Sequence, residues 1–304
     1  MAWAPYYLGD GVPRDVELPE PPPWRSFAVA EDRMAKTFQP PPGLIDAVNA
    51  ALCLRRPLLI TGSPGSGKSS VADSIASELK LGSVLRWHIT SRSTLTDALY
   101  RYDALGRLDA HQRGNSDGIG TFVELGPLGT ALLSSRRPRL LLIDEIDKSD
   151  IDLPSDLLNV LERGEFNIPE LTRHLDDDVE VRLWKDEGTA VIHAGHIRCS
   201  EFPFIVMTSN GERDFPAPFL RRCIRFTMPD PDEVQLAKIV SAHLGAEAME
   251  QAKDMLGKFA EDLRSDKKLA TDQLLNAIFL VTRSPNVEGD HRNRLMNLLL
   301  KALT

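Results

Sequence analysis

The chain has 304 residues and a formal net charge of -8, and 42% of its residues are hydrophobic and 26% charged. These values are ordinary for a globular protein. The negative net charge gives no overall basic surface for nucleic acid, but net charge alone does not test for a local basic groove. Three scattered cysteines argue against a disulfide framework and for a reducing compartment; they are Cys53, Cys199 and Cys223.

Residues 1–42 form a proline-rich arm in which regular structure is not expected. Its aromatic residues either pin it to a surface or belong to a poorly ordered tail; they are Trp3, Tyr6, Tyr7, Trp24 and Phe27. The start of the chain lacks the pattern of a signal peptide, and no apolar run approaches the length that spans a bilayer. We therefore expect a cytoplasmic protein without a membrane partner.

A phosphate-binding loop follows a predicted helix over residues 44–55. The apolar residues 58–60 predict a buried strand, residues 62–69 fit G-x-x-x-x-G-K-[ST] at every fixed position, and residues 70–79 predict a helix. Backbone N–H groups of such a loop, together with the start of the helix, offer hydrogen bonds to an anion. The candidate nucleotide-binding residues are Gly62, Ser63, Pro64, Gly65, Ser66, Gly67, Lys68, Ser69 and Ser70. We expect Lys68 to reach the β- and γ-phosphates and the Ser69 hydroxyl to bind Mg²⁺.

Two acids end the apolar run of residues 139–143, which is typical of a parallel strand buried on both faces. Asp144 and Glu145 would be costly there unless a ligand needs them, and open α/β sheets bind ligands at this edge. We expect Asp144 to hold Mg²⁺, directly or through water, and Glu145 to polarise the attacking water; the alternative is acidic capping of the next helix. Asp147 is expected to be an ordinary cap or salt-bridge residue.

Other elements complete an α/β pattern up to residue 228. Strands are predicted over residues 83–90, 121–125, 204–208 and 224–227, helices over residues 127–135 and 155–163, and a hairpin from residues 179–184 and 189–192. Residues 91–120 form a long polar passage. Asn210 follows the strand 204–208 and is expected to orient the lytic water, unless it only starts a turn with Gly211.

The character of the chain changes to helical after Pro229. Helices are predicted over residues 232–244, 246–263, 271–281 and 291–303, with no strand after residue 227. We therefore divide the chain into the arm 1–42, an α/β core 43–228 and a helical domain 229–304.

The order of phosphate loop, LLLIDE, strand ending in asparagine, arginine pair and helical segment resembles the AAA+ ATPases over roughly residues 43–304. The hairpin before Asn210 and the long passage 91–120 are similar to insertions of the MoxR branch. The resemblance implies a P-loop parallel-sheet core of three αβα layers followed by a small all-helical lid. It makes Lys68 and Ser69 the Walker A pair, Asp144 and Glu145 the Walker B pair, and Asn210 the sensor 1 residue.

The resemblance also implies that Arg222, or alternatively Arg221, serves as an arginine finger for a neighbouring subunit in a ring, expected to hold six subunits. Phosphoryl transfer gains from one more cation at the developing charge. Nucleic-acid binding or a surface salt bridge is the other interpretation of these arginines. Lys268 is the sensor 2 candidate by the same resemblance.

The leading functional hypothesis is a Mg²⁺-dependent ring ATPase that remodels or activates a partner protein. By the resemblance, such proteins are chaperone-like, often act on clients with von Willebrand A domains, and in some cases serve bacterial conflict or defence systems. The alternative is a nucleic-acid-dependent motor or loader, supported only by residues 136–139 and 221–225. A GTP-binding switch is not favoured because no N-K-x-D element is present.

One further pattern, H-x-x-H-x-x-C, offers His193, His196 and Cys199 as zinc ligands. On an alternating strand, this spacing puts the middle ligand on the opposite face, which argues against zinc.

Overall fold

The computed structural model describes residues 9–17, 20–25, 37–115, 117–186, 188–264, 269–282, 294 and 297–300. The chain forms two compact units, each treated by itself below. One comprises residues 42–61 and 75–227; the other comprises residues 1–41, 62–74 and 228–304. No helix among the described residues has the length and apolar character needed to cross a membrane.

A five-stranded parallel sheet forms the centre of the first unit. Its strands lie in the order β11 (Ile224–Thr227), β1 (Leu58–Thr61), β10 (Phe204–Ser209), β5 (Leu140–Asp144) and β2 (Leu85–His88). All of β10 and the apolar residues of β1 and β5 are buried, as expected for parallel strands covered on both faces. Helix α2 (Leu44–Leu54) packs on β11 and β1. The predicted α/β class is confirmed, and each of these strands was predicted, β2 at half its predicted length.

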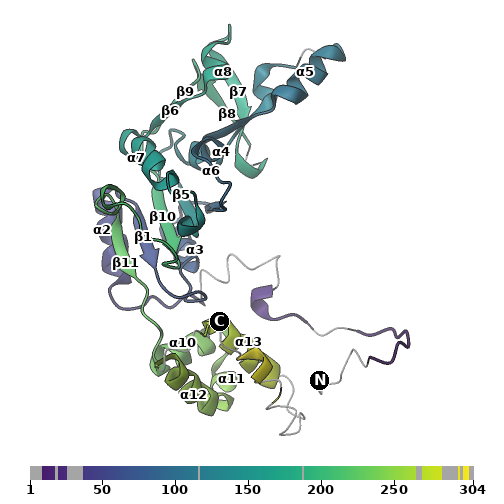
Figure 1. Cartoon of the computed structure of the whole chain (residues 1–304), viewed down its shortest axis with the longest axis vertical. Coiled ribbons are helices and arrows are strands. Elements are labelled where there is room, and N and C mark those ends of the chain that lie inside the picture. Colours follow the sequence, from purple (N-terminus) through teal and green to yellow (C-terminus); the bar gives the residue numbers. More distant parts are fainter. Residues whose placement is uncertain are drawn as a thin grey trace. The chain divides into compact units, whose positions relative to one another are not determined.

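A second sheet in the same unit has the strand order β3, β4, β7, β8, β9, β6, and its pairs are antiparallel except for β4 with β7. The strands are β3 (Tyr100–Tyr102), β4 (Val123–Leu125), β6 (Glu165–Asn167), β7 (Asp178–Arg182), β8 (Thr189–His193) and β9 (His196–Arg198). The pairing of β7 with β8 confirms the predicted hairpin. Figure 1 shows β6 to β9 gathered with α8 (Pro169–Thr172), away from α2 and β11.

The two sheets share one hydrophobic core. Helix α6 (Pro127–Ala131) contacts β2 and β5 of the first sheet and β4 of the second. Buried side chains from both sheets meet in this core, including Leu141, Ile143, Leu125 and Val181. Helices α7 (Leu153–Arg163) and α9 (Ala217–Leu220) pack against each other in this unit. The second sheet is therefore a built part of the unit and not a loose appendage.

The polar passage 91–120, for which no helix or strand was predicted, is largely regular. It contains α4 (Leu95–Leu99), β3, α5 (Ala104–Gln112) and the start of a 3-10 turn, η2 (Ile119–Phe122). The Thr94 and Asp103 side chains cap the two helices by accepting the backbone N–H groups of Asp97 and Gly106. The predicted strand 121–125 shortens to β4, and the predicted helix 127–135 ends at Ala131.

Among its described residues, the second unit is built on four helices with their own core. These are α10 (Glu233–Leu244), α11 (Ala246–Gln251), α12 (Lys253–Arg264) and α13 (Thr271–Thr282). Leu236, Val240, Phe259 and Ile278 are buried at its centre. The helix predicted over residues 246–263 is two helices, because Ala252 leaves helical geometry between them. Most of the helix predicted over 291–303 lies outside the described residues.

Candidate functional site

The phosphate loop lies in the second unit, between the end of β1 at Thr61 and the start of α3 (Ser70–Leu79). Gly62, Gly65 and Gly67 have φ values of 154°, 72° and 86°, which favour glycine. A Cβ added at Gly62 would lie 2.9 Å from the Cβ of Met228, and one at Gly65 would lie 2.5 Å from the Cβ of Ala270. Backbone conformation and close packing therefore both require glycine at positions 62 and 65.

Lys68 reaches across this loop. Its side chain is 7% exposed, and Nζ donates hydrogen bonds to the carbonyl oxygens of Gly62 and Ser63, each at 2.8 Å. The Ser63 hydroxyl in turn donates to Asp230 at 3.0 Å. The buried Ser66 hydroxyl finds no hydrogen-bond partner among the described residues. An ammonium and a buried hydroxyl donor thus lie within one short loop, which suits the binding of an anion.

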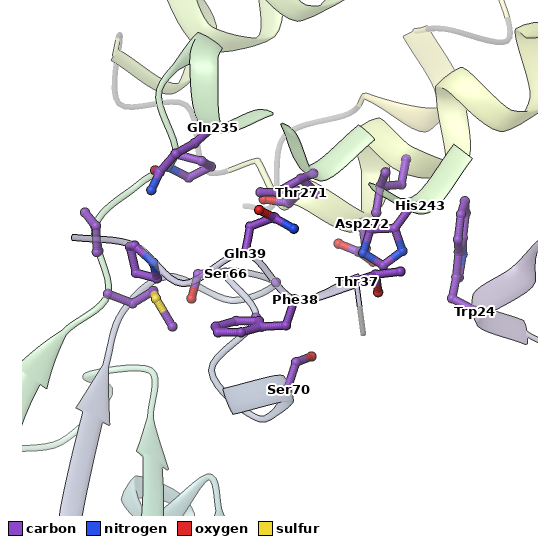
Figure 2. A pocket seen from close by; sticks show the side chains of 18 residues that line it. Trp24, Thr37, Phe38, Gln39, Ser66, Ser70, Gln235, His243, Thr271 and Asp272 are labelled. Carbon is purple, nitrogen blue, oxygen red and sulfur yellow. The ribbon is translucent and has the colours of Figure 1, made fainter. Parts of the chain in front are cut away.

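A cavity of about 220 Å³ opens beside this loop, within the same unit (Figure 2). The loop contributes Gly65, Ser66, Gly67 and Ser70 to its lining. Helices α10 and α13 contribute further residues. So does chain that precedes the α/β core, through Trp24, Thr37, Phe38, Gln39 and Pro41. None of these N-terminal and helical residues was predicted as a site residue, because nothing in the sequence brings them to the loop.

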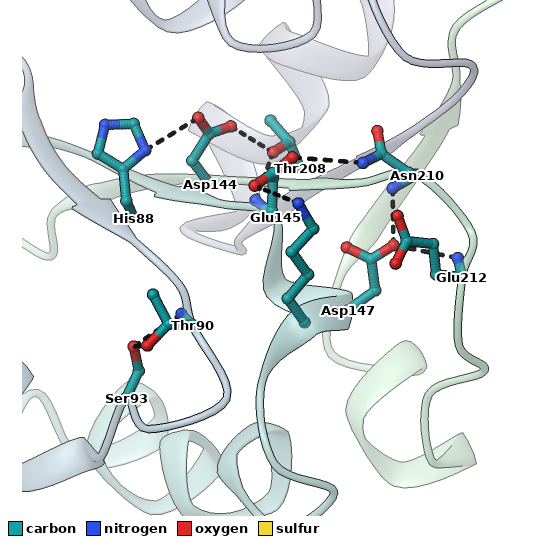
Figure 3. Close-up of polar contacts among 10 residues, drawn as sticks. His88, Thr90, Ser93, Asp144, Glu145, Asp147, Thr208, Asn210 and Glu212 are labelled. Atoms are coloured by element: carbon teal, nitrogen blue, oxygen red, sulfur yellow. Dashed lines mark hydrogen bonds and ion pairs between the residues drawn. The ribbon is translucent and has the colours of Figure 1, made fainter. Parts of the chain in front are cut away.

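Asp144 and Glu145 lie at the carboxyl end of β5, in the first unit (Figure 3). Thr208 of β10 donates its hydroxyl to Asp144 Oδ1 at 2.6 Å and accepts the Glu145 backbone N–H at 2.9 Å. The second Asp144 oxygen lies 3.3 Å from His88 Nδ1 at the end of β2. Three neighbouring strands therefore orient the Asp144 carboxylate, and Thr208 is a contributor that the sequence analysis missed.

The Glu145 side chain projects from a strained backbone, with φ 60° and ψ 48° in the left-handed region. Its carboxylate lies 2.9 Å from Lys148 Nζ, and Asn210 Nδ2 lies 3.5 Å from Oε1. The hydrogen bond with Glu145 raises the pKa of Lys148 above its ordinary value. The structure thus brings together Glu145 and Asn210, which were predicted to share a site.

Asp147 differs from its prediction as a cap or salt-bridge residue. Its side chain is 3% exposed, and Oδ2 accepts the backbone N–H groups of Asn210 at 2.8 Å and Glu212 at 3.1 Å. Its other oxygen, Oδ1, is buried with no hydrogen-bond partner among the described residues. Asp147 therefore fixes the loop after β10, a role hidden from sequence analysis because its partners lie more than 60 residues away.

The two arginine candidates have different surroundings in the first unit. Arg222 Nε contacts Glu162 of α7, and its guanidinium also donates to the Pro218 carbonyl at 3.0 Å. The Arg221 side chain is exposed, and its backbone carbonyl accepts a hydrogen bond from Arg56. The finger role of either arginine stays a prediction. Lys268 lies outside the described residues.

The zinc pattern is not assembled. His193 bonds Asp178 at 2.9 Å, which raises its pKa, and His196 bonds Asn167 at 2.6 Å. Burial raises the pKa of the Cys199 thiol. Across the described part of the chain, no three His, Cys, Asp or Glu side chains group closely enough to hold a metal ion.

Residues 57–223, more than half of the chain, match the family model of the AAA domain (dynein-related subfamily). No curated protein matches the chain. Among solved structures, a putative ATPase from Cytophaga hutchinsonii is 14% identical with a TM-score of 0.41, covering 69% of this chain and 52% of that one. Domain III of the replication initiation protein DnaA from Thermotoga maritima is 18% identical with a TM-score of 0.46, covering 89% of this chain and 98% of that domain. The chain thus spans about half the length of the Cytophaga protein.

Proposed function

This chain belongs to the AAA domain family, dynein-related subfamily, and on that premise we propose that it binds ATP with Mg²⁺ and hydrolyses it to ADP and phosphate. The proposal rests chiefly on one observation, the contact of Glu145 with Asn210 beside the oriented Asp144 carboxylate. A phosphate loop alone supports binding. A carboxylate and an amide beside one another at the carboxyl end of the sheet can in addition accept a proton from a water molecule and position that water for attack on a phosphate.

Five of the predicted site residues have a proposed role in that reaction. The Lys68 ammonium exchanges its hydrogen bonds to the Gly62 and Ser63 carbonyls for hydrogen bonds to phosphate oxygens, and it neutralises part of their negative charge. Glu145 takes the proton of the attacking water as general base, and Asn210 positions that water. The Ser69 hydroxyl and the Asp144 carboxylate are oxygen donors of the kind Mg²⁺ prefers and are its proposed ligands. The ion, when bound, offsets the negative charge of the phosphates.

Glu145→Gln tests the hydrolysis assignment. The variant should bind ATP with little change in affinity and lose turnover by about 100-fold or more, because the amide cannot take a proton from water. ATP affinity is measured by calorimetry and turnover by phosphate release. Glu212→Gln is the matched control, since Glu212 is exposed near the same site and contributes its backbone N–H to Asp147. Full turnover in Glu145→Gln would reject the role of Glu145.

We further propose a MoxR-like ring, expected to be a hexamer, that remodels a partner protein in a chaperone-like manner. The ring follows from the resemblance to the AAA+ ATPases, in which an arginine of one subunit completes the site of its neighbour. The second sheet supports this branch, because β3 of the passage 91–120 and the hairpin of β7 with β8, on which the resemblance rests, are both part of it. The helical residues 229–304 would serve as the lid. A client with a von Willebrand A domain and a place in a conflict or defence system follow from the family resemblance alone.

The proposed ring is tested through the arginine finger, because a finger from one subunit would complete the active site of its neighbour. The contact of Arg222 with Glu162 is partly exposed and is worth about 0–1 kcal/mol, so the guanidinium can leave it at small cost. Arg222→Ala should bind ATP but hydrolyse it slowly. Mixing it with Glu145→Gln subunits should restore turnover, because some interfaces then combine an intact Glu145 with an intact Arg222. Arg221→Ala run in parallel tells the two arginines apart, and no recovery at any mixing ratio would contradict a finger in trans.

The client is sought by capture with Glu145→Gln in the presence of ATP, with Lys68→Ala as the control that should not hold nucleotide. Turnover stimulated by nucleic acid at physiological salt would instead favour the motor or loader alternative.

A further inference from the structure

The cavity beside the phosphate loop is completed by chain that precedes the region matching the AAA domain. The family match begins at residue 57, whereas Trp24, Thr37, Phe38 and Gln39 all line this cavity. Figure 2 shows Phe38 beside Ser66 of the loop and Trp24 beside His243 of α10. The N-terminal residues therefore extend the cavity from the phosphate loop towards the helices of the same unit.

Trp24 is held in a fixed orientation at the helical side of this cavity. Its Nε1 donates a hydrogen bond to Asn276 Oδ1 of α13 at 3.1 Å. Its ring makes edge contacts with His243, at 6.1 Å between centroids and 80°, and with Phe279, at 5.7 Å and 69°. An indole with its N–H satisfied and its edges packed offers its remaining surface as a rigid wall.

Phe38 occupies the opposite end of the cavity. A Cβ added at Gly67 would lie 3.7 Å from its ring, so the ring rests directly on the loop backbone. Besides Phe38 and Trp24, the lining includes the aliphatic side chains of Ile239 and Leu275. Its polar side chains away from the loop are those of Thr37, Gln39, Gln235, His243, Thr271 and Asp272.

The chemistry of the cavity changes along its length. The loop end offers the Ser66 hydroxyl and backbone donors to an anion. The rest of the lining combines aromatic and aliphatic surface, from Trp24, Ile239 and Leu275, with side chains that can hydrogen-bond the edge of a ring, such as Gln235 and Thr271. A ligand that matches both ends carries a polyphosphate at one end and a flat, mostly apolar ring at the other. A nucleoside triphosphate has this form, and aromatic side chains are effective surfaces for nucleotide bases.

We infer that Trp24 is a wall of the binding site for the base and sugar of the nucleotide, so that the segment before the AAA domain is part of the ATP site. This inference rests on the proposed binding of ATP. It assigns the N-terminal segment a role in affinity for the nucleoside and none in holding the phosphates. Nucleotide occupancy is then sensed by residues that lie outside the matched domain.

A comparison of ATP with inorganic tripolyphosphate tests the inference on the full chain. In Trp24→Leu, affinity for ATP should fall about tenfold while affinity for tripolyphosphate stays at the wild-type value, because only ATP carries a base. Trp24→Phe keeps an aromatic wall and should bind ATP within about threefold of wild type. Lys68→Ala should weaken both ligands. Calorimetry in Mg²⁺ measures all of these affinities.

The outcomes separate this inference from the proposed function. Wild-type chain that binds neither ligand would reject the proposed function. Wild-type affinity for ATP in Trp24→Leu, or an equal loss for both ligands, would overturn the inference alone. If Trp24→Leu does not fold, hydroxyl-radical footprinting of the wild-type chain replaces it: ATP should protect the Trp24 ring from oxidation more than tripolyphosphate does, and equal protection would overturn the inference.

Discussion

The phosphate loop and the acidic cluster hold their polar groups in different ways. In the loop, Lys68 bonds carbonyls five and six residues away, so the loop is organised by its own backbone. In the acidic cluster, Asp144, Glu145 and Asp147 are held by Thr208 and Asn210, more than 60 residues along the chain. The loop geometry is thus local, whereas the cluster exists only when β5 and β10 pair. Changes in the loop should affect nucleotide binding, and changes in the cluster should affect turnover.

Among the variants that test this comparison, Lys68→Ala should have the largest effect, and that effect should be on nucleotide affinity. Affinity for ATP should fall about 100-fold, because hydrogen bonds from a charged donor to phosphate are lost. Calorimetry measures the affinity, and Lys80→Ala, which removes an exposed positive charge outside the loop, is the control for the change in net charge. Unchanged affinity would show that Lys68 does not contact the phosphates.

Asp147→Ala should act on turnover. Two backbone N–H groups lose their acceptor, so the Asn210 loop loosens and the rate of hydrolysis should fall about tenfold with ATP affinity nearly unchanged. The free energy of unfolding should drop by about 2 kcal/mol. Asp147→Asn keeps one acceptor oxygen and should recover part of the rate, whereas exposed Asp214→Ala should change neither quantity. A tenfold loss of affinity instead of rate would break the distinction between loop and cluster.

Thr208→Val should have the smallest effect. The substitution keeps the shape of a side chain that is 1% exposed and removes only the hydroxyl between Asp144 and the Glu145 backbone. We expect a turnover rate about threefold lower and a free energy of unfolding about 1 kcal/mol lower. Thr208→Ser should restore the rate but not the stability, because it deletes a buried methyl group. Steady-state kinetics and denaturant unfolding measure them. A rate loss that Ser does not restore would show that the methyl group, and not the hydroxyl, matters.

The same contrast explains what could be predicted from sequence. The loop and the five parallel strands follow from contiguous patterns: a complete glycine motif, and apolar runs such as that of β5. Of the second sheet, only β4 and the hairpin of β7 with β8 were predicted, because strands such as β6 and β9 have three residues and too little pattern to detect. Asp147 and Thr208 gain their roles from partners distant in sequence. Trp24 was listed only as an aromatic of the arm, since no local pattern connects it to α13.

The glycine at position 65 has a mechanical consequence. Because it carries no side chain, the tip of the phosphate loop lies against Ala270, immediately before α13 begins at Thr271. A contact of this kind is stiff, since there is no flexible side chain between the two segments to absorb a displacement. A displacement of the loop tip towards Ala270 would therefore press directly on the first turn of α13, the helix whose Asn276 bonds Trp24.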